Sequence, residues 1–411
     1  RETNLHGFNL TKDIHPYIVI DPVRTSTADN ADLYLQVRPG TDSALAMGVM
    51  RVLIEEDLVD RKFIERYTKG YDALEGRVLS HSLPEISKIT QIPQGRIEDL
   101  AHLYTEHRPG AIHIGWGIQR NANGGEMVSA IAMLPALTGQ VGLKGGGLIY
   151  YNFGYYGLRD ISYPHLRTEE GYTINMNQIG RELTSSDRIK ALYVYNANPA
   201  AVCPNVGLVR RGLEREDLFI VVHDLFMTDT ARYADFVLPA CTFFEREDLN
   251  LSYYHLFARV NNRAIEPLGE SKSNMEVFRL LAEYMGYTEG CFQQSEEEVM
   301  REALEGTGLR LEELRERAVH CKGGEYTAFA DGKFPTLSGR IELVPPTYTP
   351  VEGEGYRLLT PRTKFLLNSQ WWNVEAMARR LGNKVFMNPQ DGEREGIKDG
   401  ALLRIYNGRG S

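Results

Sequence analysis

The chain has 411 residues, of which 42% are hydrophobic and 25% charged, and its formal net charge is -9. This length and composition predict two or three folded domains. Lysine and arginine form no basic block, which argues against nucleic acid as a partner, and no apolar run approaches the ~20 residues of a membrane span. The four cysteines lie far apart, which predicts buried thiols rather than disulfides, a zinc site or an iron–sulfur site.

The first third of the chain alternates expected strands and helices. Short apolar runs over 17–20 and 111–114 predict buried strands. Helical spacing predicts helices over 43–56, with Asp42 as the N-cap, and over 60–67, 97–106 and 126–137. Strands that alternate with helices predict a parallel sheet with crossovers, and we therefore expect a first α/β domain over 1–141.

The composition and periodicity of the chain change several times after residue 141. Residues 142–190 are rich in glycine and tyrosine without periodicity, which predicts a loop-rich connection near an active site. A second α/β domain is expected over 191–350, with strands over 191–195 and 219–223, a helix over 273–285 and a charged helical hairpin over 295–317 that Ser295 caps. Short strands and Gly/Pro turns predict a β-rich domain over 356–411, including a strand over 401–406.

Both ends of the chain predict a fragment of a longer protein. Arg1 is not an initiator residue, and the strand expected over 401–406 leads into an Asn407-Gly408 turn without a return strand. The absence of a targeting segment therefore says little about the compartment.

One segment occurs twice, each time after a predicted strand. Every residue of the second copy carries a number 203 higher than its counterpart, as Asp21 and Asp224 illustrate. Both copies consist of an apolar strand, an aspartate, three further residues and then Thr-x-Thr-Ala-x-x-Ala-Asp. The match has no gap, and it predicts two related halves.

The first aspartate of each copy stands where open parallel sheets bind ligands, beyond the carboxyl end of a strand. Asp21 and Asp224 can each accept two hydrogen bonds, from a ribose diol or from the adjacent N–H donors of guanine. The threonines that follow can cap a short helix and bind a sugar or phosphate. The plainer alternative is that both aspartates only cap helices. Their identical contexts favour one nucleotide-sized site in each half.

Three further segments fit nucleotide sites, and each has a plainer alternative. The RPGTD segment at 38–42 provides a glycine for close backbone approach and an acid at a helix start, or simply a capped helix. The NANP segment at 196–199 offers amides to a phosphate or base, or forms a plain turn. The GWGIQR segment at 115–120 offers glycines and Arg120 to a ligand, but it lacks the third glycine of the dinucleotide fingerprint.

With these segments identified, the chain resembles the molybdopterin oxidoreductases of the dimethyl-sulfoxide-reductase type, which include formate dehydrogenases and nitrate reductases. The resemblance covers essentially all of the chain in the family's order. The segments that carry it are IDPVRTSTADNAD, RPGTD, GWGIQRNANGG, LPALTGQVGLKGGG, NANP, HDLFMTDTARYADFVLPA, FPTLSGRIEL and LLTPR. It implies an α/β fold of two pseudo-symmetric, doubly wound, mostly parallel-sheet domains, followed by the start of a β-rich C-terminal barrel domain.

The resemblance also implies a cofactor, because the family binds two molybdopterin guanine dinucleotides on one molybdenum or tungsten ion. The implied cofactor-binding residues are Asp21, Thr25, Gly40 and Asp42 at one guanosine, Asn198, Asp224 and Thr228 at the other, Gly117 and Arg120 at the pterin or phosphate, and Thr360 and Arg362 at the start of the closing C-terminal domain. The family's metal ligand, and the [4Fe–4S] cluster of many members, belong to an N-terminal region missing from this chain. No metal ligand and no catalytic residue is therefore assigned.

The function implied is a molybdenum- or tungsten-dependent catalytic subunit that carries out two-electron redox or oxo-transfer chemistry on a small substrate. The fragment alone would be inactive. The expected partners are this substrate and an iron–sulfur electron-transfer subunit, with no nucleic acid and no direct membrane span, in the cytoplasm or periplasm of a prokaryote. Candidates for the substrate pocket, each with a structural role as the first expectation, are Tyr156, Arg159, His165, Glu245 and Arg246.

Two other classes of protein compete with this interpretation. One is a metal-free scaffold or binding subunit of a redox complex that keeps the same fold. The other is a nicotinamide dehydrogenase, which the incomplete glycine fingerprint disfavours. The sequence leaves open the substrate, the direction of the reaction, molybdenum against tungsten, the redox partner and the oligomeric state.

Overall fold

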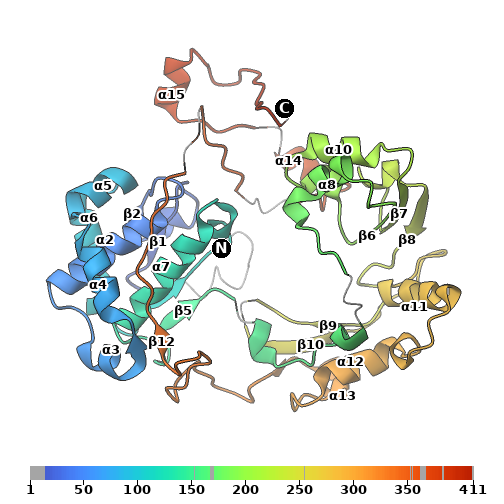
Figure 1. The fold of residues 1–411 in the computed structure, drawn as a ribbon, viewed down its shortest axis with the longest axis horizontal. Coiled ribbons are helices and arrows are strands. Elements are labelled where there is room, and N and C mark those ends of the chain that lie inside the picture. Colours follow the sequence, from blue (N-terminus) through green and yellow to red (C-terminus); the bar gives the residue numbers. More distant parts are fainter. Residues whose placement is uncertain are drawn as a thin grey trace. The chain divides into compact units, whose positions relative to one another are not determined.

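The computed structural model describes residues 14–151, 153–166, 171–253, 255–351, 353, 355–361, 367–381 and 384–409. The chain forms two compact units, and each unit consists of two separate stretches of sequence (Figure 1). Unit 1 contains Arg1–Asn152 and Gly324–Lys364, and unit 2 contains Phe153–Gly323 and Phe365–Ser411. Among the described residues, no helix has the length and hydropathy needed to cross a membrane.

The helices of unit 1 pack around one central helix, α2. Every residue from Ser43 to Met50 is buried, so α2 is covered on all sides rather than along one stripe. Figure 1 shows the neighbouring helices around it. The helices of this unit are α2 (Asp42–Glu55), α3 (Arg61–Tyr67), α4 (Tyr71–Leu79), α5 (Leu83–Thr90), α6 (Gln94–Glu106) and α7 (Gly124–Leu137).

The strands of unit 1 form three parallel pairs within the described part of the chain. β1 and β2 are joined by a short connection, whereas the strands of the other two pairs are distant in sequence. The pairs are β1 (Ile18–Ile20) with β2 (Leu33–Leu35), β4 (Ala111–His113) with β5 (Gly147–Ile149), and β3 (Thr68–Lys69) with β12 (Ile341–Glu342).

The described part of unit 2 contains two different three-stranded sheets. The parallel sheet is β6 (Ala191–Tyr195), β7 (Phe219–Asp224) and β8 (Phe236–Pro239), and its core includes Leu183 and Val209 from the helices α8 (Ile179–Ser185) and α10 (Val206–Leu213). The antiparallel sheet is β9 (Asp248–Asn250), β10 (Phe257–Asn261) and β11 (Val319–His320). The other helices before the C-terminal region are α9 (Pro199–Val202), α11 (Asn274–Met285), α12 (Glu296–Leu304) and α13 (Leu311–Glu316).

The mixed α/β class with mostly parallel sheets, expected from the sequence, is confirmed. The hairpin expected over 295–317 is confirmed as α12 and α13, and Ser295 and Glu298 form a reciprocal capping box at its start. It is less solvated than the charge pattern suggested, because Met300, Leu304 and Leu314 are buried in a shared core.

Two local expectations are wrong. The N-cap of α2 is Thr41, and Asp42 is already the first helical residue, where its carboxylate faces the positive end of the helix dipole. The strand expected over 401–406 is absent, because these exposed residues find no partner strand in the described region, and an unpaired strand leaves its backbone groups unsatisfied. The regular elements described after Tyr356 are two short helices, α14 (Glu375–Leu381) and α15 (Pro389–Arg394).

The helix packing of unit 1 generates a matched pair of substitutions. A Cβ at Gly48 in α2 would lie 2.9 Å from Ile86 Cγ2 and 3.1 Å from Ile97 Cγ2, whereas a Cβ at Gly76 in α4 would have no neighbour within 4 Å. Gly48→Ala should lower the free energy of unfolding by roughly 1–3 kcal/mol through overpacking. Gly76→Ala should raise it by about 0.5–1 kcal/mol through helix propensity. Urea titration followed by circular dichroism measures both, and equal effects would contradict the packing described.

Candidate functional site

The segment that the sequence repeats has the same structure in both units. The parallel register of β1 with β2 is reproduced by β7 with β8 at the same offset of 203, so that Val19↔Tyr34 corresponds to Val222↔Val237. The connections contain corresponding 3₁₀ helices, η1 (Ala28–Asn30) and η6 (Ala231–Tyr233). The repeat inferred from the sequence is therefore confirmed as a structural repeat.

The hydrogen bonds of the closing aspartates explain why the spacing is the same in both copies of the repeat. The closing aspartate Asp32 accepts a hydrogen bond from Tyr17 N at 2.6 Å, and Asp235 accepts one from Ile220 N at 2.7 Å. Each carboxylate thereby ties the end of the connection to the start of the first strand. The closing aspartates are structural, and they are turned away from the carboxyl ends of the strands.

The threonines of the repeat cap the short helices. Thr25 Oγ1 accepts from Ala28 N at 3.4 Å, and Thr228 Oγ1 accepts from Ala231 N at 3.1 Å. Capping is one of the two roles expected for these threonines from the sequence, beside binding of a sugar or phosphate. Each hydroxyl retains its own proton as a donor, so capping leaves one hydrogen bond for a ligand.

The leading aspartates lie at the carboxyl ends of the strands. Asp21 Oδ1 accepts from Val23 N at 2.8 Å, and Asp224 Oδ1 accepts from Leu225 N at 2.7 Å. Burial raises the pKa of both carboxyl groups above the ordinary value, and these backbone hydrogen bonds only partly offset that effect. A partly buried carboxylate of this kind would be stabilised by further N–H or O–H donors.

Asp42 lies close enough to Asp21 for their charges to interact. Burial, and to a smaller extent the neighbouring Asp21 carboxylate, raise the pKa of Asp42 to about 6. Gly40, two residues earlier, has φ +79, a left-handed conformation that favours glycine. The backbone alone therefore explains this glycine, whereas the sequence had suggested close approach of a ligand.

The GWGIQR segment presents an open backbone. Gly117 has φ -59 in front of the 3₁₀ helix η2 (Ile118–Arg120), and a Cβ at Gly115 or Gly117 would meet no atom within 4 Å. The fold therefore does not require either glycine, and this leaves room for a ligand beside the backbone. Arg120 is exposed at the end of η2 and can meet an anion there.

Asn198 is buried and engaged within unit 2. Its Oδ1 accepts from Thr230 N at 3.1 Å and from Thr230 Oγ1 at 2.8 Å, while Nδ2 donates to Asp229 at 3.2 Å. This favours the plain-turn role and leaves one amide proton for a ligand. Thr360 is exposed in unit 1, and Arg362 lies outside the described residues.

Most candidates for a substrate pocket have structural partners. Tyr156 is buried, and its hydroxyl donates to His255 O at 2.8 Å and accepts from Ser252 N at 3.0 Å. Arg159 forms an ion pair with Glu302 at 3.5 Å. Glu245 is buried and accepts from two backbone N–H groups, and Arg246 pairs with its near neighbour Asp248 at 2.7 Å. His165 is exposed, with its ring edge-on to Tyr163.

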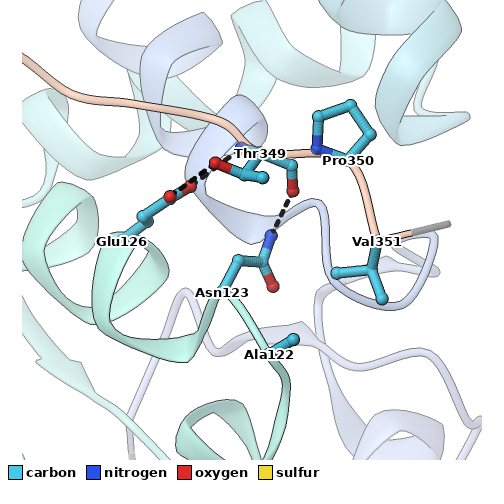
Figure 2. Close-up of a pocket in the computed structure, with 6 residues that line it drawn as sticks. All are labelled: Ala122, Asn123, Glu126, Thr349, Pro350 and Val351. Carbon is cyan, nitrogen blue, oxygen red and sulfur yellow. Dashed lines mark hydrogen bonds between the residues drawn. The ribbon is translucent and has the colours of Figure 1, made fainter.

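A residue that the sequence analysis did not single out is Asn123, directly before α7. It is 6% exposed, and its Nδ2 donates to Gly40 O at 2.9 Å and to Thr349 O at 3.0 Å. Its Oδ1 is buried and has no hydrogen-bond partner. A hollow of about 270 Å³ lies beside it (Figure 2), and its lining residues are Ala122, Asn123, Glu126, Thr349, Pro350 and Val351. The only sequence signal was its place in the GWGIQRNANGG segment.

The protein groups suited to a metal are scattered. Among the described residues, no group of three or more His, Cys, Asp or Glu side chains could hold a metal ion. The cysteines Cys203, Cys241, Cys291 and Cys321 are free thiols. What the chain offers instead are acceptors and open backbone suited to an organic cofactor: partly buried carboxylates at strand ends, the segment around Gly117 and the exposed Arg120.

These features agree with comparisons to known proteins. A family model described as "Molybdopterin oxidoreductase" matches residues 7–284, and the chain belongs to this family. The probable oxidoreductase YoaE of Bacillus subtilis is 40% identical over 99% of this chain and 64% of its own length. The F420-dependent formate dehydrogenase subunit alpha of Methanocaldococcus jannaschii is 28% identical over 96% of this chain and 64% of its own length.

Two further matches also cover most of this chain and about 60% of their own length. The dimethyl sulfoxide reductase DmsA of Escherichia coli is 29% identical over 96% of this chain and 59% of its own length. The solved structure of acetylene hydratase from Pelobacter acetylenicus has a TM-score of 0.75 at 22% identity and shows the same fold over 93% of this chain and 62% of its own. The chain thus spans less than two thirds of the length of these relatives.

The raised pKa of Asp42 predicts a pH-dependent stability. The folded protein retains this proton up to a pH of about 6, whereas the ordinary value is 3.8. The free energy of unfolding should therefore fall as the pH rises through that window, because the folded state there binds more protons than the unfolded state. Asp42→Asn should remove the contribution of Asp42, weaken this pH dependence and raise the melting temperature at neutral pH relative to the unsubstituted protein.

Asp72, an exposed acid in the first turn of α4, provides the matched control. Asp72→Asn should leave the pH profile of the melting temperature unchanged. A profile for Asp42→Asn that runs parallel to that of the unsubstituted protein would contradict the burial of this carboxyl group.

Proposed function

We propose that the full-length protein is the catalytic subunit of a molybdenum- or tungsten-dependent oxidoreductase that carries out two-electron redox or oxo-transfer chemistry on a small substrate. The observation that carries this proposal is the structural repeat, which presents the same strand-end carboxylate in each unit. Two equivalent nucleotide sites are what a pair of molybdopterin guanine dinucleotides requires. The names of relatives, among them a formate dehydrogenase subunit and a dimethyl sulfoxide reductase, support the same class.

In this proposal, each unit holds one guanosine at its strand ends. Carboxylates there accept hydrogen bonds from a ribose diol or from guanine N–H groups, and the neighbouring threonine hydroxyls donate to phosphate or sugar oxygens. The residues assigned to unit 1 are Asp21, Thr25, Gly40 and Asp42. Those assigned to unit 2 are Asn198, Asp224 and Thr228.

Other residues would hold the remaining parts of the cofactor. Gly117 leaves its backbone open to the pterin or phosphate, and the Arg120 guanidinium neutralises phosphate charge. Thr360 and Arg362 would contact the cofactor from the start of the C-terminal domain. The bound metal supplies two-electron redox chemistry, while the side chains of this chain bind and orient the cofactor. An iron–sulfur electron-transfer partner and the small substrate itself belong to the same proposal.

Cofactor analysis of the purified full-length protein tests this function. We expect molybdenum or tungsten by elemental analysis, together with guanine in a twofold excess over the metal after acid release. Protein without metal and without nucleotide would instead identify a scaffold or binding subunit with the same fold. Saturable binding of NAD in a fluorescence titration would favour the nicotinamide dehydrogenase.

Substitution of the repeated aspartates tests the paired sites. Asp21→Ala and Asp224→Ala should each reduce the guanine content by about half, because each removes the acceptor in one unit, and the double variant should lose most of it. The control is Asp29→Ala, since Asp29 belongs to the same segment but is exposed and paired with Arg24 at 2.8 Å. A single aspartate substitution that leaves the guanine content intact would disprove the site in that unit.

A further inference from the structure

The orientation of the Asn123 amide is fixed by its partners. Nδ2 donates to two backbone carbonyls, Gly40 O at 2.9 Å and Thr349 O at 3.0 Å. A reversed amide would place Oδ1 against both carbonyl oxygens, which carry no proton to donate. Oδ1 is therefore an acceptor. In Figure 2 the amide nitrogen is turned toward Thr349, and the oxygen is turned away from it.

This oxygen is buried but unpaired, which is unusual. Asn123 is 6% exposed, and Oδ1 has no hydrogen-bond partner in the described structure. Buried polar atoms in folded proteins almost always have a partner. The amide also does not cap α7, because no side-chain hydrogen bond closes the start of that helix. The geometry thus leaves Oδ1 available to a donor from outside the chain.

The space beside Oδ1 has room for more than water. The hollow measures about 270 Å³, whereas one water takes about 30 Å³ of liquid. Ala122, Pro350 and Val351 provide apolar walls, and Glu126 is occupied, since its carboxylate accepts from Thr349 N at 2.8 Å and Thr349 Oγ1 at 2.6 Å. A hollow with apolar walls on one part and one unpaired acceptor beside it suits the edge of a planar heterocycle that carries N–H donors.

The acceptor lies beside the strand-end acids of unit 1. The position of a Cβ on Gly40 would be 3.6 Å from Asn123 Oδ1 and 3.6 Å from Val351 Cγ2. Asp42 follows two residues later, and Asp21 interacts with its charge. The Arg357 guanidinium lies 3.2 Å from the same Cβ position and donates to the carbonyls of Pro39 and Val351. Asn123 Oδ1 therefore lies in the same part of unit 1 as Gly40, which leads into Asp42.

We propose that the hollow receives the guanine base of the unit 1 cofactor and that Asn123 Oδ1 accepts a hydrogen bond from its N–H edge. This proposal rests on the proposed function and assigns to Asn123 a role in choosing the base. Guanine presents two adjacent donors, N1–H and the 2-amino group, to neighbouring acceptors. Adenine presents a bare ring nitrogen beside its amino group, and that nitrogen would face Oδ1 without a proton between them.

The test counts the guanine released from full-length protein with two different substitutions. Asn123→Ala removes the acceptor but also both bonds to backbone carbonyls. Ala122→Leu keeps those bonds and fills the hollow. Each variant should lose about half of its guanine. The matched control is Asn121→Ala, because Asn121 lies in the same loop, bonds the Ile118 carbonyl at 3.1 Å and does not line the hollow.

Combined variants identify which guanine is lost. Ala122→Leu with Asp21→Ala should still retain about half of the guanine, since both act in unit 1, whereas Ala122→Leu with Asp224→Ala should lose most of it. If circular dichroism shows that Asn123→Ala does not fold, the guanine content of Ala122→Leu alone decides whether the hollow holds guanine.

Full guanine content in folded Ala122→Leu would overturn the inference, leave the proposed function standing and assign the hollow to water. Absence of guanine from the unsubstituted protein would overturn both.

Discussion

The architecture of each repeat depends on a hydrogen bond between a carboxylate and the start of a strand. Parallel strands normally require a long crossover, often a complete helix, yet β1 and β2 are joined by a short connection with one 3₁₀ turn. Asp32 makes this possible by accepting from Tyr17 N, and Asp235 does the same at Ile220 N. Because both connections are tied in this way, the leading aspartates are held at the carboxyl ends of the strands.

The two halves differ in the surroundings of Thr230, which directly precedes η6, and of its counterpart Thr27. Thr230 is fully buried and exchanges hydrogen bonds with Asn198 and Ala200, so the NANP turn is joined to the repeat in unit 2. Thr27, its counterpart in unit 1, is only half-buried. Asn123 of unit 1 makes a separate set of contacts, because its Nδ2 donates to the carbonyls of Gly40 and Thr349.

Local features were predictable from the sequence, whereas long-range partners were not. The strand over Ala191–Tyr195, the capping box at Ser295 and the repeat follow from patterns within a few residues. Gly40 is a candidate for close approach of a ligand, and the structure adds a second reason for glycine there, its left-handed backbone. Asn123 was missed because the hydrogen bond that orients its amide goes to the carbonyl of Thr349, 226 residues away. A local sequence pattern cannot predict such a distant contact. The strand expected over 401–406 is absent for a related reason: an apolar pattern within a segment does not show whether another strand is available to pair with it.

The pairing of β3 with β12 makes unit 1 discontinuous in the chain. Lys69 O accepts from Leu343 N at 2.8 Å, and the Leu343 side chain is buried among residues of the first stretch. During synthesis, the ribosome must therefore deliver all of the intervening stretch, Phe153–Gly323, before the core of unit 1 can close. Such late contacts slow folding and prolong exposure of apolar surface to chaperones and proteases. Unit 1 behaves in this respect as a host domain interrupted by an insertion, and a chain truncated before Leu343 would have a permanently open core.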